Sequence, residues 1–447
     1  MIYSILKSAR ASLILGLLGS PGISAASCNS VAITSVADAD TLRGNCQTVN
    51  GTVTIGPFAE SKTTLYINLD GIEVIEGSLQ VYENNFKNKS VASGPFALSS
   101  STLGEVQGSV DFGRGPNTLW NLTLPNLTTV HNKFIIDDSP VTYLDITALE
   151  SVSSFTLATK NLTTLQHTKF TNLTNLSISS NRIGSLDSFF NNPIDISDSQ
   201  AVGPFPNVDG ITVGFTSGYV GIYAAVNVTL GGPTTTEMNL SDLYLGQNIT
   251  ALNRSPELEL LTATELKLED TTMTRLDVEF DDLRILGVGS SSYSTLEEIR
   301  LPSRAVNWTG GFNFISEFSP NLNLSSQYGT DDDGNRVQTW YWPTNVSVVV
   351  ITDTIVDNAF FDTFVAQQMK SLNNTSTLEE FIIYPGVGSN FSCTPFDTLR
   401  DMNRLPSGAQ AYACESRTTT STASSVYSIR VFSLTCIASV VACLILL

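Results

Sequence analysis

The sequence has few charged residues, few basic residues and almost no histidine. Only 15% of its 447 residues are charged, with 23 Lys and Arg against 42 Asp and Glu, giving a formal net charge of −19, and two are histidine. Because a nucleic-acid-binding protein contacts phosphates through clustered Lys and Arg, this composition excludes that class. The 42% hydrophobic content excludes general disorder. A surface with so little charge needs another source of solubility.

Motifs of common enzyme classes are absent as well. The sequence contains no G-x-S-x-G, no H-E-x-x-H and no phosphate-binding glycine loop. The two histidines, His131 and His167, are 36 residues apart, and we expect both at solvent-facing turn positions. The sequence therefore predicts no cofactor and no metal, and it favours a protein that is not an enzyme.

Carboxylates keep one enzymatic alternative open, because a glycosidase needs only two of them facing each other across a cleft. The candidates are three acidic doublets: Asp137-Asp138, Asp281-Asp282 and Glu297-Glu298. Neighbouring residues of a strand point to opposite faces, so a doublet does not form such a pair by itself. We interpret the doublets as a solvated rim.

Two further segments have a binding and a structural interpretation. In the run Asp331-Asp332-Asp333-Gly334-Asn335, the glycine is fourth, whereas an EF-hand calcium loop has it sixth, so a polar turn is favoured. Residues 340–342, Trp-Tyr-Trp, would form a sugar-stacking platform if exposed, but buried aromatics are the favoured interpretation.

The beginning of the sequence is typical of a secretory signal peptide. Within residues 1–26, Lys7 and Arg10 precede a short apolar run, and the small residues Ser24-Ala25-Ala26 provide a cleavage site. We expect the mature chain to start near Ser27.

The end of the sequence is typical of a glycosylphosphatidylinositol (GPI) attachment signal. A short Ser/Thr-rich stretch, residues 416–430, is followed by a hydrophobic tail, residues 431–447, which is removed on attachment. Ser421 is the predicted attachment residue, with Ser416 and Ala423 as alternatives. A tail-anchored transmembrane helix is the competing interpretation, but no basic residue follows the apolar run. The two ends predict a chain in the secretory pathway, held on the outer leaflet of the plasma membrane and in the cell wall.

Six cysteines are present, and two of them, Cys436 and Cys443, lie in the tail. The other four form two local pairs, Cys28 with Cys46 and Cys393 with Cys414, although four cysteines allow three connectivities. In an oxidising compartment these residues predict disulfides. Pairing within each cluster would close both ends of the folded region. A zinc site is disfavoured, because no C-x-x-C and no accompanying histidine occur.

The sequence contains 17 N-x-[ST] sequons, roughly twice the number that its Asn, Ser and Thr content gives by chance, and N-linked glycans are bulky, solubilising and confined to the surface. Asn253 is a weak site because Pro256 follows its Ser255, and Asn374 overlaps Asn373. The predicted glycosylation sites are therefore Asn50, Asn88, Asn121, Asn126, Asn161, Asn172, Asn175, Asn227, Asn239, Asn248, Asn307, Asn323, Asn345, Asn373 and Asn390.

Internal repeats occupy the middle of the chain. The apolar pattern of residues 119–130 returns in residues 141–152, with every position displaced by 22. Residues 173–183 match the leucine-rich-repeat consensus L-x-x-L-x-L-x-x-N-x-L. Much of this consensus returns in residues 240–248, 273–283 and 296–301. Upstream, a V-x-G-x-V-x-I pattern is centred on Gly51, Gly77 and Gly108, and Asn132 replaces the glycine in a fourth unit. We expect bends at these four positions, where a left-handed backbone is tolerated.

The spacing of the repeats predicts the fold. Apolar pairs spaced by two residues recur about every 11 residues, as at Leu122, Phe134, Leu144 and Phe155. Such alternation predicts short strands with one buried face. Two strands per unit of about 22 residues predict an all-β, right-handed parallel β-solenoid, whose coils bury their apolar side chains against their neighbours. A globular β-sandwich is the alternative, but it would not keep this period.

The glycine-centred units, the L-x-x-L-x-L segments and the Cys28/Cys46 pair resemble the receptor L-domain. With both terminal signals and the sequons, residues 28–415 resemble the fungal GPI-anchored cell-wall organisation glycoproteins, the family of the yeast sporulation-specific and extracellular-mutant wall proteins. The resemblance implies two L-domain-like units, residues 27–190 and 191–415. It also implies a plasma-membrane or wall-bound glycoprotein that is needed for normal wall architecture and has no established reaction. The Ser/Thr-rich stalk is shorter than this family leads one to expect.

Three hypotheses about function follow. The first is a non-enzymatic, GPI-anchored glycoprotein whose partners are cell-wall polysaccharide (the glucan and mannan network) or wall proteins, with a lipid link to the membrane and no nucleic acid. The second is a glycosidase or transglycosylase that remodels wall polysaccharide on the same scaffold. The third is a receptor-like ectodomain for adhesion or signalling.

Overall fold

The computed structural model describes most of the chain between residues 27 and 418. The described residues are 27–58, 63–81, 94–113, 118–167, 170–180, 182–183, 199–202, 210–223, 227–246, 249–289, 295–299, 308, 311–317, 321–325, 328–330, 333–370 and 378–418. The predicted signal peptide, the hydrophobic tail, Ser421 and the predicted boundary at residue 190 lie outside them.

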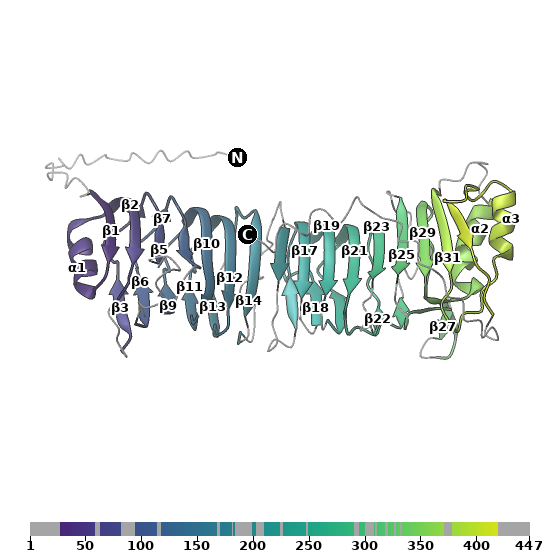
Figure 1. Cartoon of the computed structure of the whole chain (residues 1–447), viewed down its shortest axis with the longest axis horizontal. Helices are drawn as coiled ribbons and strands as arrows, with labels where there is room; N and C mark the ends of the chain where they lie inside the picture. The colour runs from purple at the N-terminus through teal and green to yellow at the C-terminus, as the bar shows by residue number, and fades with distance from the viewer. Residues whose placement is uncertain are drawn as a thin grey trace, which may run out of the picture.

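The chain is built mostly of strands in parallel sheets, which confirms the predicted all-β parallel class. The strands stand side by side along an elongated molecule (Figure 1). The largest sheet, called the long sheet below, has 18 strands. In chain order these are β1 (Ser27–Ile33), β2 (Thr48–Ile55), β4 (Val74–Ile75), β5 (Leu79–Val81), β7 (Glu105–Val106), β8 (Val110–Phe112), β10 (Thr129–Ser139), β12 (Ser151–Thr159), β14 (Asn175–Ser180), β15 (Ser199–Val202), β17 (Ser217–Tyr223), β19 (Glu237–Gly246), β21 (Leu260–Glu269), β23 (Asp282–Gly289), β25 (Phe312–Glu317), β29 (Val346–Thr352), β31 (Glu380–Tyr384) and β32 (Tyr412–Cys414).

Shorter strands form a second row beside the long sheet (Figure 1). One parallel sheet contains β3 (Leu65–Asn68), β6 (Phe96–Ser99), β9 (Leu119–Thr123), β11 (Tyr143–Asp145) and β13 (Thr164–Gln166). Further along are the parallel groups β16 (Ile211–Val213), β18 (Asn227–Leu230) and β20 (Ala251–Arg254); β22 (Arg275–Leu276) and β24 (Glu298–Ile299); and β26 (Asn323–Leu324) and β30 (Ile355–Val356). The strands β27 (Tyr328–Thr330) and β28 (Arg336–Gln338) pair in the antiparallel sense.

The register of the strands reproduces the spacing of the sequence repeats. Leu122 of β9 pairs with Leu144 of β11, and Val130 of β10 pairs with Val152 of β12, so both pairs keep the displacement of 22 residues. The glycine-centred units also align, since Val49 pairs with Ile75 and Ile75 with Val106. The long sheet runs on across the predicted boundary at residue 190, because β14 pairs with β15 and β15 with β17.

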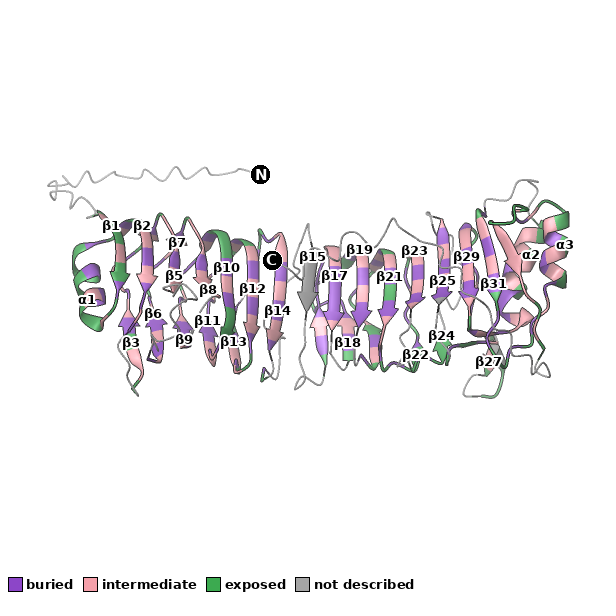
Figure 2. Cartoon of the chain, in the orientation of Figure 1, coloured by how far each residue is buried: buried purple, intermediate pink, exposed green. Residues whose placement is uncertain are grey.

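The core lies between the two rows of strands. Alternate residues of the strands are buried, such as Phe155 and Leu157 in β12 and Leu144 in β11, each with 0% of its surface exposed. Figure 2 shows this alternation as bands of buried and partly exposed residues along the strands. Because each strand contributes one apolar face, neighbouring units bury each other's side chains along the whole molecule.

Helices occur at the two ends of the strand rows (Figure 1). At the N-terminal end, α1 (Val36–Asn45) follows β1 and begins at Ser35, whose hydroxyl accepts a hydrogen bond from the Asp38 backbone N–H at 3.2 Å. At the other end are the 3₁₀ helix η1 (Asn358–Phe361), α2 (Asp362–Lys370) and α3 (Thr394–Asp401). These helices were not predicted from the sequence. Since α1 contacts β1 and β3, it covers the first edge of the strand rows.

The glycine-centred units stack backbone on backbone. The Gly77 N–H donates to the Gly51 carbonyl at 3.0 Å, the Gly108 N–H to the Gly77 carbonyl at 2.8 Å, and the Asn132 N–H to the Gly108 carbonyl at 3.2 Å. A Cβ added at Gly77 would lie 2.5 Å from the Gly51 carbonyl carbon. Of the three glycines, only Gly51 has a positive φ. Glycine is therefore required at Gly77 and Gly108 by close approach of neighbouring backbones, which corrects our expectation of left-handed bends there.

Candidate functional site

The four predicted structural cysteines form the two disulfides that the sequence predicted. Cys28 is bonded to Cys46 and Cys393 to Cys414, with Cα–Cα distances of 5.8 and 5.9 Å. The first bond joins β1 to the end of α1. The second joins the residue before α3 to β32, at the opposite end of the molecule. Within the part of the chain that the structure describes, no cluster of His, Cys, Asp and Glu is arranged to hold a metal.

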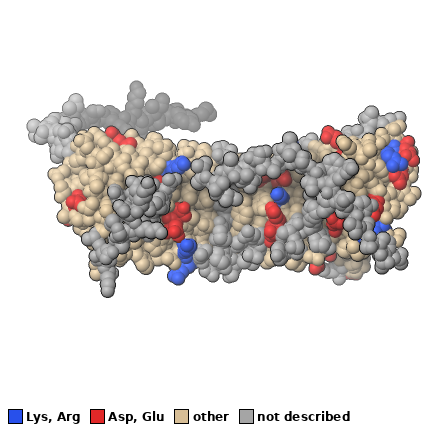
Figure 3. All heavy atoms as spheres, in the orientation of Figure 1, with Lys and Arg blue, Asp and Glu red and all other residues tan. Residues whose placement is uncertain are grey.

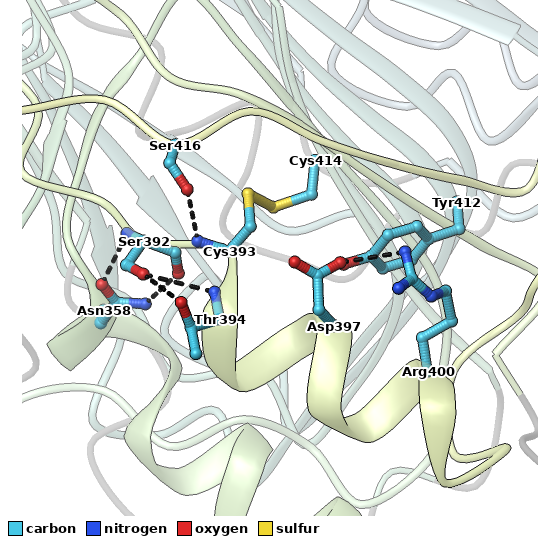
Figure 4. The surroundings of a disulfide bond; sticks show 9 residues. All are labelled: Asn358, Ser392, Cys393, Thr394, Asp397, Arg400, Tyr412, Cys414 and Ser416. Atoms are coloured by element: carbon cyan, nitrogen blue, oxygen red, sulfur yellow. Dashed lines mark hydrogen bonds and ion pairs between the residues drawn. A yellow bond between two sulfur atoms is a disulfide. The ribbon is translucent and has the colours of Figure 1, made fainter.

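The surroundings of the C-terminal disulfide are closely hydrogen-bonded (Figure 4). The Cys393 N–H donates to the Ser416 hydroxyl at 2.8 Å, and the Tyr412 hydroxyl donates to Asp397 Oδ1 at 3.0 Å. The Arg400 guanidinium lies 2.9 Å from Asp397 and stands over the Tyr412 ring. Ser416 therefore belongs to the folded end of the molecule, which makes it a poor attachment residue compared with Ser421.

No sequon asparagine is buried among the residues that the structure describes. Asn50, Asn126, Asn172, Asn227, Asn239, Asn253, Asn323 and Asn390 are exposed, and Asn121, Asn161, Asn175 and Asn345 are half-buried. Asn88, Asn248, Asn307, Asn373 and Asn374 lie outside the described residues. Several of these asparagines also hold neighbouring units together. For example, Asn239 Oδ1 accepts a hydrogen bond from the Thr262 hydroxyl at 2.9 Å.

The acidic doublets do not face one another across an open site. Asp138 pairs with Lys160 at 3.2 Å on the surface. Asp281 pairs with Arg254 at 3.0 Å and accepts a hydrogen bond from the Leu261 backbone N–H at 2.8 Å, so its carboxylate ties neighbouring units together. Glu297 and Glu298 are both exposed at β24. The surface positions of Asp138, Glu297 and Glu298 agree with the interpretation of a solvated rim. The doublet Asp281-Asp282 departs from it, because Asp281 binds neighbouring units and Asp282 Oδ1 is buried.

The two histidines occupy different environments. His131 is exposed on β10, with its Nε2 2.8 Å from Glu105. His167 is buried, 3% exposed, and its Nε2–H donates to the Leu149 carbonyl at 3.1 Å. Burial lowers the pKa of His167 to about 4, so its ring is neutral at pH 7. The expectation of a solvent-facing turn was therefore wrong for His167, whose ring packs at 3.9 Å against that of Phe170.

The tryptophans of the Trp-Tyr-Trp segment are core residues. Trp340 is 1% and Trp342 0% exposed, and both pack on Phe314 and Phe360. The Trp342 indole N–H donates to the Phe360 carbonyl at 2.7 Å. This segment therefore offers no exposed sugar-stacking platform. The acidic run that precedes it joins β27 to β28, where Gly334 has φ +83°; Asp331 and Asp332 lie outside the described residues.

Sequence reasoning missed a patch of aromatic and charged side chains on the long sheet. Three neighbouring strands, β17, β19 and β21, build it, and β23 borders it. Their inward residues, such as Val220, Leu243 and Leu266, are 0% exposed, so the residues that alternate with them face outward. We call this set the Tyr–Glu patch; it consists of Tyr219, Tyr223, Asp242, Tyr244, Glu265, Lys267 and Glu269.

The register arranges the Tyr–Glu patch as three rows across the strands. In the first row Tyr219 pairs with Asp242, and Asp242 with Glu265. The second row runs from Gly221 through Tyr244 and Lys267 to Gly287. The third row runs from Tyr223 through Gly246 to Glu269. Aromatic and charged side chains thus alternate with glycines, at which the backbone carries no side chain.

The side chains of the patch contact one another. The Tyr244 hydroxyl donates a hydrogen bond to Glu269, and Lys267 Nζ lies 5.4 Å from the centroid of the Tyr244 ring. The Tyr223 and Tyr244 ring centroids are 5.3 Å apart. A Cβ added at Gly246 would lie 3.2 Å from Cδ1 of Tyr223, so the Tyr223 ring lies across the bare backbone of Gly246.

Burial shifts the titration of several groups in the patch. It raises the pKa of Tyr219 and of Tyr244, and the hydrogen bond to Glu269 raises the pKa of Tyr244 further. Burial also raises the pKa of Glu265, and the charge of neighbouring Asp242 adds to that shift. Perturbed titratable groups on a surface are a recognised indication of a functional site.

Asp242 and Glu265 are the carboxylate pair that the sequence analysis looked for but did not find. They stand directly opposite each other on β19 and β21, close enough for the charge of Asp242 to add to the raised pKa of Glu265. A glycosidase needs its two carboxyls about 5–9.5 Å apart, to leave room for the sugar and for water. Directly opposite positions of neighbouring parallel strands lie about 4.8 Å apart, just below that range, so the pair is better placed to accept hydrogen bonds from one ligand group.

The period of the sequence could have located the Tyr–Glu patch. Tyr219 and Asp242, Asp242 and Glu265, and Tyr244 and Lys267 are each separated by 23 residues. The same displacement relates their apolar neighbours Leu243 and Leu266. The sequence analysis aligned only the apolar positions of the repeats, although the outward positions between them follow the same register.

No family model, curated protein or solved structure matches this chain. Among the described residues, no helix has the length and apolar character needed to cross a bilayer.

Proposed function

We propose that this chain is a non-enzymatic, GPI-anchored cell-surface glycoprotein that contributes to the organisation and integrity of a fungal cell wall. The observation that carries the proposal is the exposure of the sequons, since none of the twelve described sequon asparagines is buried. A glycan needs a surface position, because it is bulky and solvated. The two disulfides add support, because they require an oxidising compartment.

As the finer description of the fold we propose a right-handed parallel β-solenoid with about 22 residues per coil and disulfide-capped ends, similar to the receptor L-domain. Parallel pairing at displacements of 21 to 23 residues supports it, as between Phe134 and Phe155, Leu122 and Leu144, and Leu243 and Leu266. Such a scaffold presents long sheet faces to extended polymers. In a wall its partners would be the glucan and mannan network or other wall proteins.

The distribution of charge supports a role at a glycosylated surface. In Figure 3 most of the described surface in view carries neither acidic nor basic groups, and the charged side chains stand in small groups. Glycans on the exposed sequons would provide the hydration that a charge content of 15% does not. The hydrolase alternative has less support, because the best carboxylate pair, Asp242 and Glu265, occupies directly opposite positions of neighbouring strands, about 4.8 Å apart.

The anchor is tested by treating intact cells that express the chain with phosphatidylinositol-specific phospholipase C. We expect the protein to be released, and mass spectrometry of the released chain to find no peptide from residues 431–447. A matched variant that lacks residues 431–447 should be secreted without the enzyme. Retention of the full-length chain after treatment, with the tail peptide still detected, would contradict the anchor.

The glycoprotein character and the absence of catalysis are tested on the purified chain. Peptide-N-glycosidase should reduce the apparent mass by several glycans, and the purified chain should not shorten β-glucan, chitin or mannan. Cells that lack the protein should become more sensitive to wall-binding dyes. Turnover of any of these polymers would move the function to the hydrolase alternative.

A further inference from the structure

We propose that the Tyr–Glu patch on β17, β19 and β21 is a binding site for a neutral hexopyranose polysaccharide, whose chain runs across the strands. This inference rests on the proposed function and specifies where on the long sheet a wall polymer binds. The patch combines the two kinds of group that recognise sugars. Flat aromatic rings pack against the C–H faces of pyranose rings, and carboxylates accept hydrogen bonds from hydroxyl groups.

The aromatic part of the site is held in place before any ligand arrives. The Tyr223 ring lies across Gly246, where no side chain separates it from the backbone, and it packs against Tyr244 at 5.3 Å. The Tyr244 ring is fixed by its hydrogen bond to Glu269 and by Lys267 at 5.4 Å. Because these contacts fix the side chains, binding costs little conformational entropy.

The bare backbone beside the rings gives a polymer room. A Cβ added at Gly287 would meet no atom closer than 3.8 Å, and one at Gly289 none closer than 3.9 Å. Gly287 pairs with Lys267, and Gly289 follows Val288, which pairs with Leu268. The two glycines therefore continue the second and third rows of the patch as a flat strip next to Lys267 and Glu269.

The spacing of the strands fits a polymer laid across them. Neighbouring strands lie about 4.8 Å apart, so equivalent positions of β17, β19 and β21 repeat at that interval across the patch. A polymer laid across the strands would therefore meet side chains of more than one strand, as Tyr244 and Lys267 stand on neighbouring strands in the second row of the patch. This repeat favours a polymer over a single sugar.

The charge of the patch and the positions of the sequons restrict which polysaccharides can bind. The patch carries three acidic side chains, Asp242, Glu265 and Glu269, and one basic side chain, Lys267, so an acidic polysaccharide would be repelled. The sequence has no sequon between Asn253 and Asn307, which leaves β21 and β23 free of attached glycans. Asn239 stands at the beginning of β19, level with Ser217 and Thr262, and its glycan would border the patch at one end.

The test is a binding measurement by calorimetry on the purified, glycosylated full-length chain. The probes are a β-1,3-glucan hexaose, a chitin hexaose, an α-mannan oligosaccharide and, as the acidic comparison, an oligogalacturonate. We expect at least one neutral probe to bind and the oligogalacturonate not to bind. Saturation by the acidic probe alone, or binding of none of the neutral probes, would overturn the proposal.

Variants locate the site. Tyr223→Ala should weaken binding of the neutral probe at least tenfold, whereas Tyr223→Phe, which keeps the ring, should stay within about threefold of the parent chain. Glu269→Gln should weaken binding by removing a charged acceptor without changing volume. The matched control is Tyr66→Ala, which removes an exposed tyrosine of β3 outside the patch and should leave binding unchanged.

The outcomes separate this proposal from the general function. Thermal unfolding of each variant checks that it is folded. If Tyr223→Ala does not fold, Tyr223→Phe and Glu269→Gln still test the site. Equal binding by the parent, Tyr223→Ala and Glu269→Gln chains would overturn the patch while leaving a wall-bound glycoprotein intact. If phospholipase does not release the protein and peptide-N-glycosidase does not reduce its mass, the proposed function is overturned, whatever the patch binds.

Discussion

His167 is a titratable side chain inside the apolar core. Its ring packs against Phe170, and its Nε2–H donates to the Leu149 carbonyl at 3.1 Å. Burial holds its pKa at about 4, below the ordinary value of 6.5. In the folded chain the ring therefore stays neutral at a pH where the unfolded chain already binds a proton.

This difference predicts an acid-sensitive core. The contribution of the neutral ring to folding is complete above about pH 6.5 and is lost as the pH falls towards 4, because the unfolded state then gains a proton that the folded state does not. The expected loss is about 3 kcal/mol between these limits for the shift of His167 to about 4. Urea unfolding at pH 7 and pH 4.5 measures it.

The matched variant is His167→Gln, which keeps an N–H donor for Leu149 and removes the titration. Its stability should fall less than that of the parent between pH 7 and pH 4.5. Asp357 acts in the opposite direction, since burial raises its pKa to about 6 and its contribution is lost as the pH rises from about 3.8 to 6. Because the parent and the variant both contain Asp357, the difference between their losses of stability is due to His167. Equal stability profiles with pH would contradict the prediction.

Single residues were predictable where their chemistry is local. A sequon or a cysteine pair is recognisable from a few letters. None of the described sequon asparagines is buried, and the cysteines form the two predicted bonds. The position of His167 was not predictable, because an imidazole is compatible with either face of a strand end and neighbouring Phe170 decides between them. The Tyr–Glu patch was missed for a related reason: its members come from three strands and meet only through the register.

The glycine stack at the N-terminal end sets the distance between strand units. Gly77 stands on the backbone of Gly51, and Gly108 on that of Gly77. Gly77→Ala would place a Cβ 2.5 Å from the Gly51 carbonyl carbon, so the strands must move apart. We expect a loss of about 1–3 kcal/mol in the free energy of unfolding, the cost typical of overpacking, measured by urea unfolding.

Gly44→Ala is the matched control for that substitution. Gly44 lies in α1, and a Cβ there would meet no atom within 4 Å. The change should stabilise the chain by about 0.5–1 kcal/mol, since alanine loses less backbone entropy than glycine in a helix. If both substitutions have the same effect, close approach does not explain the requirement for glycine.

The C-terminal disulfide ties α3 to the last strand of the long sheet. Replacing Cys393 and Cys414 together by Ser opens a loop of 21 residues. We expect a loss of about 3 kcal/mol, from the greater freedom of the unfolded chain, and a lower unfolding midpoint in calorimetry. The Cys28 and Cys46 double replacement is the comparison at the other end. Unchanged midpoints for both would show that the bonds do not stabilise the fold.

The elements were predictable in the regular middle of the chain and not at its ends. The L-x-x-L-x-L pattern predicted strands correctly. It did not distinguish the long sheet from the row of shorter strands, because β14 of the former and β22 of the latter both have one buried face. After residue 301 the repeats were indistinct, since paired residues such as Phe314 and Val349 are 35 apart. The longer units include η1 and α2, whose apolar residues follow no strand period.

The whole molecule combines a net charge of −19 with a charge content of only 15%. We therefore expect its solubility to depend on sugar. Enzymatic removal of the N-glycans from the native protein should increase light scattering on concentration or heating, while the circular dichroism spectrum at low concentration stays unchanged. Glycosylated protein carried through the same steps is the control. Equal scattering by both forms would show that the bare surface suffices.

The hydrogen bonds beyond the C-terminal disulfide determine how the molecule responds to mechanical load. Phe391 and Arg417 exchange two backbone hydrogen bonds of 2.8 Å, three residues after Cys414. A pull applied to the chain after residue 418 meets this bridge first and then the covalent bond to Cys393, which transfers the force to the start of α3 and the aromatic core beneath it. The last strand, β32, thus cannot be peeled away residue by residue, and the molecule withstands tension at this end as one block.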